Sequence, residues 1–118
     1  MGSRIILIED EPLIAADIEF AIQDAGYDVV GSARTVDEGL RLLKTTVCDG
    51  AVIDANLNGQ SSKAIVDKLD LAAVPYIVVS GYTRDQIDFL KEGTVLIGKP
   101  FRMSDLTNAI RENLVREN

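Results

Sequence analysis

The sequence contains no histidine and no tryptophan, and its single cysteine is Cys48. Without histidine, imidazole catalysis and imidazole metal ligation are both excluded, so any phosphoryl chemistry must use carboxylates. A lone cysteine cannot form an internal disulfide, which is compatible with a reducing cytosol and a cytoplasmic protein. No apolar run approaches the roughly 20 residues of a membrane span, and no signal peptide is visible, so we expect no membrane partner.

Basic residues are scarce relative to acidic ones. The 118 residues include 12 Lys and Arg against 19 Asp and Glu, which gives a formal net charge of −7. This balance argues against direct nucleic-acid binding, which relies on clustered cations. Hydrophobic residues make up 47%, enough for the core of a single domain over residues 1–118. The opening Met1-Gly2-Ser3 is typical of a cloning remnant.

Short apolar runs alternate with segments of helical periodicity along the whole chain. This alternation predicts an α/β fold, a doubly wound five-stranded parallel sheet with five helices on its two faces. The predicted strands are Arg4–Ile8, Tyr27–Gly31, Gly50–Ile53, Pro75–Val79 and Thr94–Ile97. The predicted helices begin at Pro12, at the capping pattern of Thr35 and Glu38, before Ile65, weakly over Asp85–Leu90, and at Ser104 or Asp105.

Polar side chains follow four of the predicted strands. Glu9-Asp10-Glu11 comes after the first strand, Asp54 after the third, Ser80 after the fourth and Lys99 after the fifth. Because parallel strands end at one edge of a sheet, and ligands bind at that edge, we expect these residues to gather there. Carboxylates, a hydroxyl and an ammonium together could hold a divalent cation and a phosphoryl group.

Carboxylates gathered in this way repel one another, and a hard divalent cation removes that cost. Mg²⁺ takes oxygen ligands, commonly carboxylates, waters and phosphate oxygens. For Glu11 we prefer a simpler interpretation, which is that an acid favours the N-terminus of the following helix. The predicted ligands of Mg²⁺ or Mn²⁺ are Asp10 and Asp54 directly, Glu9 directly or through water, and the backbone carbonyl of Asn56.

Asp54 is the candidate nucleophile, since a carboxylate can attack phosphorus and form an aspartyl phosphate. Such transfer depends mainly on positioning and charge neutralisation, which a metal ion and Lys99 can supply. Ser80 can donate its hydroxyl to a phosphoryl oxygen. Taken alone, Ser80 would be a turn residue and Lys99 a solvated lysine, but Pro100 restrains the backbone of Lys99 and a cis bond there would be a deliberate feature. Tyr82 either shields the phosphoryl group or is an ordinary surface tyrosine.

These motifs together resemble the receiver domain of two-component response regulators. The resemblance rests on Glu9-Asp10-Glu11-Pro12, Asp54, Ser80-Gly81 and Lys99-Pro100-Phe101, in this order and at these spacings, and it covers essentially the whole chain. It implies a flavodoxin-like sheet of order 2-1-3-4-5 with five helices. It further implies a bacterial phosphorelay in which a histidine kinase or histidine phosphotransfer protein phosphorylates Asp54. By this matching Glu9 and Asp10 are the acidic pair, Ser80 is the switch hydroxyl and Lys99 contacts the phosphate.

The resemblance also implies an output surface, made of the fourth helix, fifth strand and fifth helix, that addresses a downstream protein target. It leaves open a homodimer through the same face. Leu96 departs from the family, because receivers often carry Tyr or Phe at this position, so we expect the output face to signal differently. The segment Ile77–Tyr82 is similar in part to a subgroup with a Phe-Ala-Thr-Gly-x-Tyr-like signature, which includes many receivers without an attached effector.

Other classes fit parts of the pattern. An aspartate-dependent phosphatase usually has a second acid two residues after its nucleophile, and Asn56 cannot serve as that acid. A degenerate receiver, used only as a protein-interaction module, would lack one of the key residues, and none is missing. A nucleotide-binding flavodoxin-like protein needs a glycine-rich loop after its first strand, which is absent here. We therefore predict a phosphorylation-operated signalling switch and not an enzyme; the sequence leaves the cognate kinase, the output and the oligomeric state open.

Overall fold

The five predicted strands form one parallel sheet in the computed structural model, which describes residues 3–114. The sheet order is β2-β1-β3-β6-β7, and because β4 and β5 form a separate hairpin, this is the predicted order 2-1-3-4-5. The predicted cloning remnant falls partly on residues 1–2, which lie outside the described residues. The sheet strands are β1 (Arg4–Ile8), β2 (Asp28–Ala33), β3 (Gly50–Asp54), β6 (Tyr76–Ser80) and β7 (Val95–Gly98).

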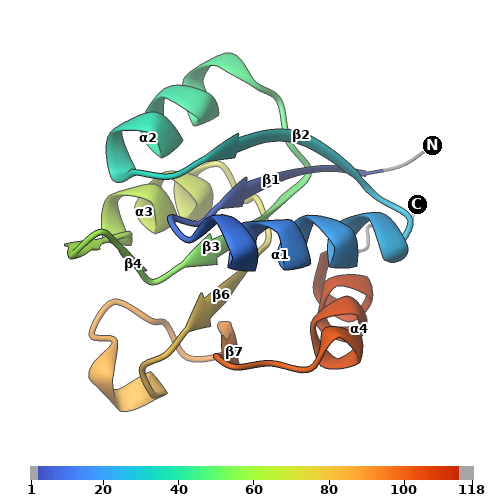
Figure 1. Ribbon diagram of the computed structural model, residues 1–118. Helices are drawn as coiled ribbons and strands as arrows, with labels where there is room; N and C mark the ends of the chain where they lie inside the picture. The colour runs from blue at the N-terminus through green and yellow to red at the C-terminus, as the bar shows by residue number, and fades with distance from the viewer. Residues whose placement is uncertain (1–2, 115–118) are drawn as a thin grey trace.

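Helices cover both faces of the sheet, α1 and α4 on one and α2 and α3 on the other (Figure 1). Strand β1 shows why both faces must be covered. Its residues Ile5 and Leu7 pack in the core under α1 and α4, whereas Ile6 and Ile8 pack under α2 and α3. No helix of the described residues has the length and apolar character that crossing a bilayer requires. The helices are α1 (Pro12–Asp24), α2 (Val36–Thr45), α3 (Lys63–Leu71) and α4 (Met103–Leu114).

The helix starts follow the predicted signals. Pro12 opens α1, where its missing N–H costs nothing. Thr35 is the N-cap of α2, and its Oγ1 accepts a hydrogen bond from the backbone N–H of Glu38 at 3.1 Å. After α1 the chain turns through Gly26 with a φ of 94°, a value that glycine adopts without strain. These signals set where the helices begin and end, whereas the parallel pairing of the strands places their polar ends at one edge.

The loop after β3 is more ordered than its turn-forming sequence indicates. It forms a small antiparallel hairpin of β4 (Asn56–Leu57) and β5 (Gln60–Ser61). The two residues between these strands, Asn58 and Gly59, have φ values of 52° and 85°. Positive φ at both positions is the requirement of a type I′ hairpin turn, and the Asn-Gly pair supplies it. The hairpin fixes the chain directly beyond Asp54.

The prediction of a helix over Asp85–Leu90 was wrong. The segment between β6 and β7 contains only the 3₁₀ turn η1 (Arg84–Gln86), so the described residues hold four α-helices instead of five. The backbone of Ile87 is extended, with φ −111° and ψ 99°, and its side chain is buried against Ala55 and Val78. A helix of six residues is too short to be stable by itself, so this tertiary contact decides the conformation.

Candidate functional site

The register of the sheet brings the polar strand ends to one edge. Ile8 pairs with Ile53, so the next residues, Glu9 and Asp54, lie side by side. Asp54 in turn is level with Val79 of β6, one residue before Ser80. Ser80 pairs with Gly98, and Lys99 follows directly. Four segments far apart in the sequence therefore meet at the carboxyl edge of the sheet.

Four carboxylates form a cluster at this edge. Glu9, Asp10, Glu11 and Asp54 each place one carboxylate oxygen within 4.8 Å of the oxygens of the other three. Glu9 and Asp54 are nearly inaccessible, with exposures of 1% and 6%, whereas Glu11 is exposed. Such a concentration of negative charge is unfavourable unless cations or hydrogen-bond donors face it.

Backbone N–H groups orient three of these carboxylates. The N–H of Glu11 donates to Glu9 Oε2 at 3.1 Å, and the N–H of Asn58 donates to Asp10 Oδ2 at 3.1 Å. The N–H of Asn56 donates to Asp54 Oδ1 at 3.0 Å. The hairpin after β3 thus supplies two of the three donors, which explains why an ordered loop stands beside Asp54. Asn56, the residue whose carbonyl we predict to be a metal ligand, contacts the cluster through its N–H.

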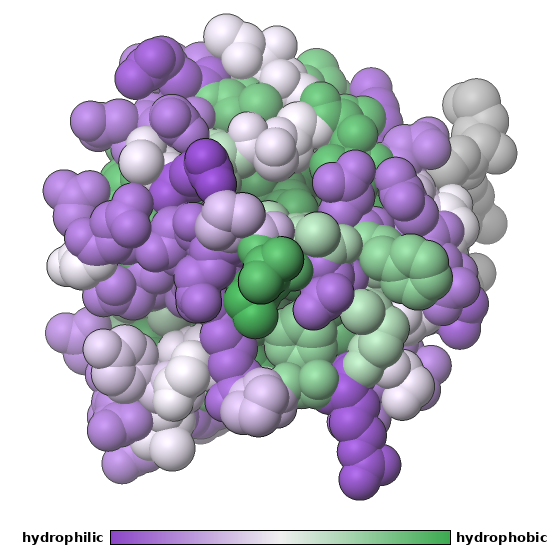
Figure 2. All heavy atoms as spheres, viewed as in Figure 1, coloured by the Kyte–Doolittle hydropathy of each residue, from purple (hydrophilic) through white to green (hydrophobic). Residues whose placement is uncertain are grey.

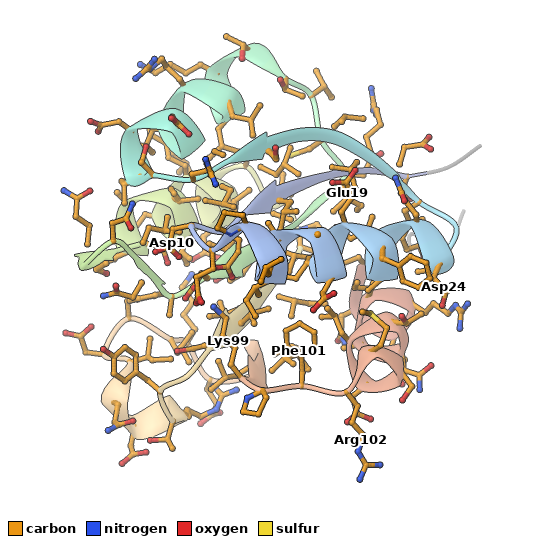
Figure 3. The ribbon with its side chains drawn as sticks, viewed as in Figure 1. Asp10, Glu19, Asp24, Lys99, Phe101 and Arg102 are labelled. Carbon is orange, nitrogen blue, oxygen red and sulfur yellow. The ribbon has the colours of Figure 1, made fainter. Side chains whose placement is uncertain are left out.

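Lys99 is the cation that faces the cluster. Its Nζ lies 2.6 Å from Asp54 Oδ2, 3.0 Å from Glu9 Oε1 and 3.3 Å from Glu11 Oε1. Only 14% of its side chain is exposed. In Figure 3 the Lys99 side chain points from the end of β7 toward the loop that carries Asp10, whereas the neighbouring Arg102 points away from the molecule. The bond between Lys99 and Pro100 is cis.

The charges in this cluster perturb one another. Burial disfavours the charged form of Lys99, but its contacts with Asp54 and Glu9 outweigh burial and raise the pKa of Lys99 above its ordinary value. Removal from solvent raises the pKa of Glu9 to about 7, and the nearby charge of Asp54 acts in the same direction. The N–H of Glu11 and the Lys99 ammonium oppose this rise. Glu9 Oε1 is buried and makes no hydrogen bond in the described chain, although it lies beside Lys99.

This donor set fits a hard divalent cation. All four side chains offer carboxylate oxygens, the ligands that Mg²⁺ and Mn²⁺ prefer, and the buried Glu9 Oε1 has the ion pair with Lys99 but no hydrogen bond, so a bound cation would give it a further partner. The cluster holds four carboxylates against the single ammonium of Lys99, so a second cation would also balance its charge. Of the residues predicted to bind the metal, Glu9, Asp10 and Asp54 therefore lie in one acidic cluster.

Ser80 lies at the same edge, but its hydroxyl does not reach Asp54. In the described residues Ser80 Oγ accepts a hydrogen bond from the N–H of Tyr82 at 2.9 Å, and the backbone carbonyl of Ser80 accepts from the N–H of Lys99 at 2.8 Å. Tyr82 is 52% exposed and lines a cavity of about 110 Å³ with Asn56 and Phe89. The bond from Tyr82 uses Ser80 Oγ as an acceptor and leaves its hydroxyl hydrogen available to donate to a phosphoryl group.

Glu11 takes part in the site more directly than our preferred interpretation of the sequence indicated. We interpreted it as an acid that favours the start of α1, and it does occupy the N-cap position, but its side chain makes no capping hydrogen bond there. Instead the carboxylate joins the acidic cluster and contacts Lys99. The available signal was its position in the acidic run beside Glu9 and Asp10.

The chain matches the model of the response regulator receiver domain over residues 5–111. It is 33% identical over 118 residues to the phyllosphere-induced regulator PhyR of Methylorubrum extorquens, an alignment that covers 97% of this chain and 44% of that protein. It is 25% identical to the transcriptional regulatory protein PdtaR of Mycobacterium tuberculosis, over 91% of this chain and 54% of that protein. The chain spans about half the length of these curated relatives.

Solved structures show the same similarity. The response regulator PhyR from Brucella abortus superposes with a TM-score of 0.84 at 32% identity, covering 97% of this chain and 48% of that one. SdrG from Sphingomonas melonis has a TM-score of 0.80 at 28% identity, over 92% of this chain and 93% of that one. The match over residues 5–111, these neighbours and the strand order agree, and the chain belongs to the response regulator receiver domain family of two-component systems.

Proposed function

We propose that this chain is a phosphorylation-operated switch in which Asp54 accepts a phosphoryl group from a phosphorylated histidine of a kinase or phosphotransfer protein. The observation on which the proposal depends is the contact of 2.6 Å between Lys99 Nζ and the buried Asp54 carboxylate within an acidic cluster. The ammonium holds the Asp54 carboxylate in place. The other carboxylates of the cluster, at the same edge of the sheet, lie close to that of Asp54.

In the transfer, a carboxylate oxygen of Asp54 forms a bond to phosphorus while the bond from phosphorus to the donor nitrogen breaks. The bonding electrons leave with the imidazole, which takes up a proton. Lys99 neutralises negative charge on the transferred oxygens, the main requirement of phosphoryl transfer. Glu9, Asp10, Asp54 and the Asn56 carbonyl would hold Mg²⁺, or Mn²⁺, which supplies further charge neutralisation when bound.

Receiver domains are signalling proteins, and an enzymatic role has no support in this site. Residue 56, two residues after Asp54, is the position of a general acid in an aspartate-dependent phosphatase, and here it is Asn, which has no proton to give to a leaving group. Asn56 instead orients Asp54 through its N–H and Gly59 through its side chain, with bonds of 3.0 Å and 2.9 Å.

The downstream partner is proposed to be a protein. One similar structure, from Bartonella quintana, is described as an anti-anti-sigma factor PhyR mutant, with a TM-score of 0.83 at 28% identity over 97% of this chain and 49% of that one. The helix predicted over Asp85–Leu90, which would belong to the output face, is not formed. In its place η1 and the segment Ile87–Thr94 would lie beside β7 and α4, where α4 is the helix that we predicted as the fifth. A homodimer through this face, and a cytoplasmic location, stay predictions.

The switch can be tested with the purified chain. Incubation with Mg²⁺ and acetyl phosphate should add one phosphoryl mass, and the label should disappear in Asp54→Asn. Asp37→Asn is a matched control, because Asp37 is an exposed acid in the first turn of α2, away from the cluster. Removal of Mg²⁺ with EDTA should also abolish the label. Labelling of Asp54→Asn at the native level would show that Asp54 is not the acceptor, and complete absence of labelling in the native chain would favour a receiver that acts only as an interaction module.

A further inference from the structure

A pocket lies at the edge of the sheet opposite to Asp54. It is bounded by the C-terminal ends of α2 and α3 and by the loops that lead from them into β3 and β6. Its volume is about 510 Å³, within the roughly 300–1,000 Å³ that is typical of small-molecule sites. The receiver chemistry at the other edge does not use this pocket.

The inner lining of the pocket is apolar. Leu40 and Leu43 come from α2, Leu69 from α3 and Val74 from the loop before β6. The apolar surface continues outward through Val47 and Leu71, whose exposures of 69% and 87% are among the largest of any hydrophobic residue in the described chain. An apolar ligand would therefore find a continuous surface from the inner lining to the opening.

For contrast, Figure 2 shows other apolar side chains (green) interrupting the hydrophilic surface over α1, where Leu13 and Phe20 are exposed.

The charged residues that line the pocket are both lysines, Lys44 and Lys68, and no acidic residue lines it. This is unexpected in a chain with a net charge of −7. Within residues 3–114 neither lysine forms an ion pair. The acids nearest to them in the sequence pair with other cations, Asp49 with Arg4, Asp67 with Lys63 and Asp70 with Lys91.

A simpler reason for the two lysines is their position in the last turns of α2 and α3, where a cation balances the helix dipole. Because the pocket lies at the ends of both helices, that reason accounts for the place of each lysine, but it does not explain why no acidic residue lines the apolar hollow beside them. The combination of an apolar body and a cationic border is complementary to a molecule with an apolar body and an anionic head.

We propose that this pocket binds a small amphiphilic anion, an alkyl carboxylate of medium chain length, with its chain between α2 and α3 and its carboxylate near Lys44 and Lys68. The proposal does not depend on phosphorylation, because the pocket shares no residue with the acidic cluster. An Asp54→Asn variant should therefore bind the ligand as the native chain does, so the two proposals can fail separately.

A homologous series of ligands provides the first test. Hexanoate, octanoate and decanoate, titrated by calorimetry below the concentrations at which they aggregate, should bind about fourfold more tightly for each methylene that enters the pocket. Decanoate should bind more tightly than decyltrimethylammonium, which has a similar chain and the opposite charge. Equal affinity for the two head groups, or no dependence on chain length, would overturn the proposal.

Cys48 provides a local reporter, because it lines the pocket, is half-buried and is the chain's only cysteine. Burial raises the pKa of its thiol, so its alkylation by iodoacetamide should be followed at mildly alkaline pH. Bound decanoate should slow this alkylation, with half-protection at the calorimetric dissociation constant. Binding without protection of Cys48 would place the ligand elsewhere and contradict the proposal.

Two pairs of variants locate the ligand. Lys44→Glu combined with Lys68→Glu should weaken decanoate binding by about tenfold, since each exposed ion pair is worth about twofold to fivefold. Arg41→Glu combined with Lys63→Glu is the matched control, because these exposed cations lie on the same two helices outside the pocket.

The second pair of variants changes the size of a side chain. Ala72→Trp, at the C-cap of α3, should fill the pocket and block binding, whereas Ala64→Trp, at an exposed position of α3 outside the pocket, should not.

Equal effects in a variant pair and its control would overturn the assignment, provided that circular dichroism shows all variants folded. If no carboxylate of the series binds the native chain, the small-ligand proposal is wrong, and a segment of a protein partner becomes the alternative occupant of the apolar surface.

Discussion

Replacement of Lys99 by methionine should destabilise the metal-free protein substantially. The substitution keeps the length of the side chain and most of its packing but removes the ammonium. In the structure this ammonium is the counter-charge of Asp54, Glu9 and Glu11, with Nζ to oxygen distances of 2.6, 3.0 and 3.3 Å. Without it, four carboxylates would face one another with only backbone N–H groups to stabilise them.

The expected magnitude follows from burial. The side chains of Lys99, Glu9 and Asp54 are 14%, 0% and 8% exposed, so this is a buried ion pair. Removal of one partner of a buried pair costs about 3–5 kcal/mol, whereas an exposed pair contributes about 0–1 kcal/mol. We expect about 3 kcal/mol, the lower end, because Glu11 is 61% exposed and water can enter beside it. A domain with a stability of about 5–15 kcal/mol would remain folded.

Urea unfolding in EDTA, followed by far-ultraviolet circular dichroism, measures this loss; the chain has no tryptophan for a fluorescence assay. Lys91→Met is the matched control, because Lys91 forms an ion pair of 2.9 Å with Asp70 while its side chain is 65% exposed. It should cost no more than about 1 kcal/mol. If the two variants lose the same free energy, the contacts of Lys99 are energetically equivalent to a surface pair and our account of the cluster is wrong.

Addition of Mg²⁺ extends the experiment. In the native chain a bound cation must share Asp54 and Glu9 with the ammonium, whereas in Lys99→Met it would have these carboxylates to itself. Mg²⁺ should therefore raise the stability of Lys99→Met by more than that of the native chain, since a ligand stabilises the folded state according to its affinity. Identical Mg²⁺ effects in the two proteins would show that metal binding and Lys99 are independent.

Three further substitutions test local features by urea unfolding. Burial and the hydrogen bond to Asp70 raise the pKa of Tyr76 from its ordinary value of 10 to about 12, so its phenol stabilises the folded state fully below pH 10 and progressively less as the pH rises to about 12. The cost of Tyr76→Phe, about 1 kcal/mol near neutral pH, should therefore shrink over that window, and a constant cost would contradict this reasoning. Thr35→Ala removes the N-cap acceptor of α2 and should cost about 1 kcal/mol, whereas Thr35→Ser should retain most of the stability. Gly59→Ala should cost about 1–2 kcal/mol because of the φ of 85° alone, since no atom lies within 4 Å of an added Cβ.

The sheet was predictable because its strands are apolar on both faces and end in polar residues. Arg4–Ile8 was predicted with the bounds that the structure shows, and the other four strands differ from their predicted bounds by one or two residues at one end or both. The meeting of Asp54 and Lys99 followed from the same pattern, because strands that run parallel must end at one edge. The pattern of apolar strands with polar ends belongs to whole segments, so the predicted sheet does not depend on the exact bounds of each strand.

The segment between β6 and β7 was not predictable in the same way. Ile87, Phe89 and Leu90 have apolar spacing that a short helix would accept, but they pack with Ala55, Val78 and Leu96 instead. Arg84 holds this conformation through the backbone carbonyls of Lys91 and Thr94. These contacts join residues whose proximity depends on the finished sheet, so a local pattern cannot reveal them. The pocket between α2 and α3 is invisible in the sequence for the same reason.

The position of Ser80 connects the proposed phosphorylation to that segment. The Ser80 hydroxyl accepts a hydrogen bond from the N–H of Tyr82, the second residue of the connection to β7, so a turn of the Ser80 side chain toward a phosphoryl group on Asp54 would weaken that bond. Loss of that bond would loosen the first residues of the segment, which lie before the hydrogen bonds of Thr83 and Arg84 and before the buried Ile87.

Leu96 of β7 packs in the same cluster as Ile87, so a displacement of Ile87 would reach the predicted output face through aliphatic packing. No aromatic side chain needs to swing at position 96 in this scheme. The replacement of the usual aromatic residue by Leu96 is then compatible with the proposed switch, because in this scheme the moving element would be the segment between β6 and β7 and not the side chain on β7.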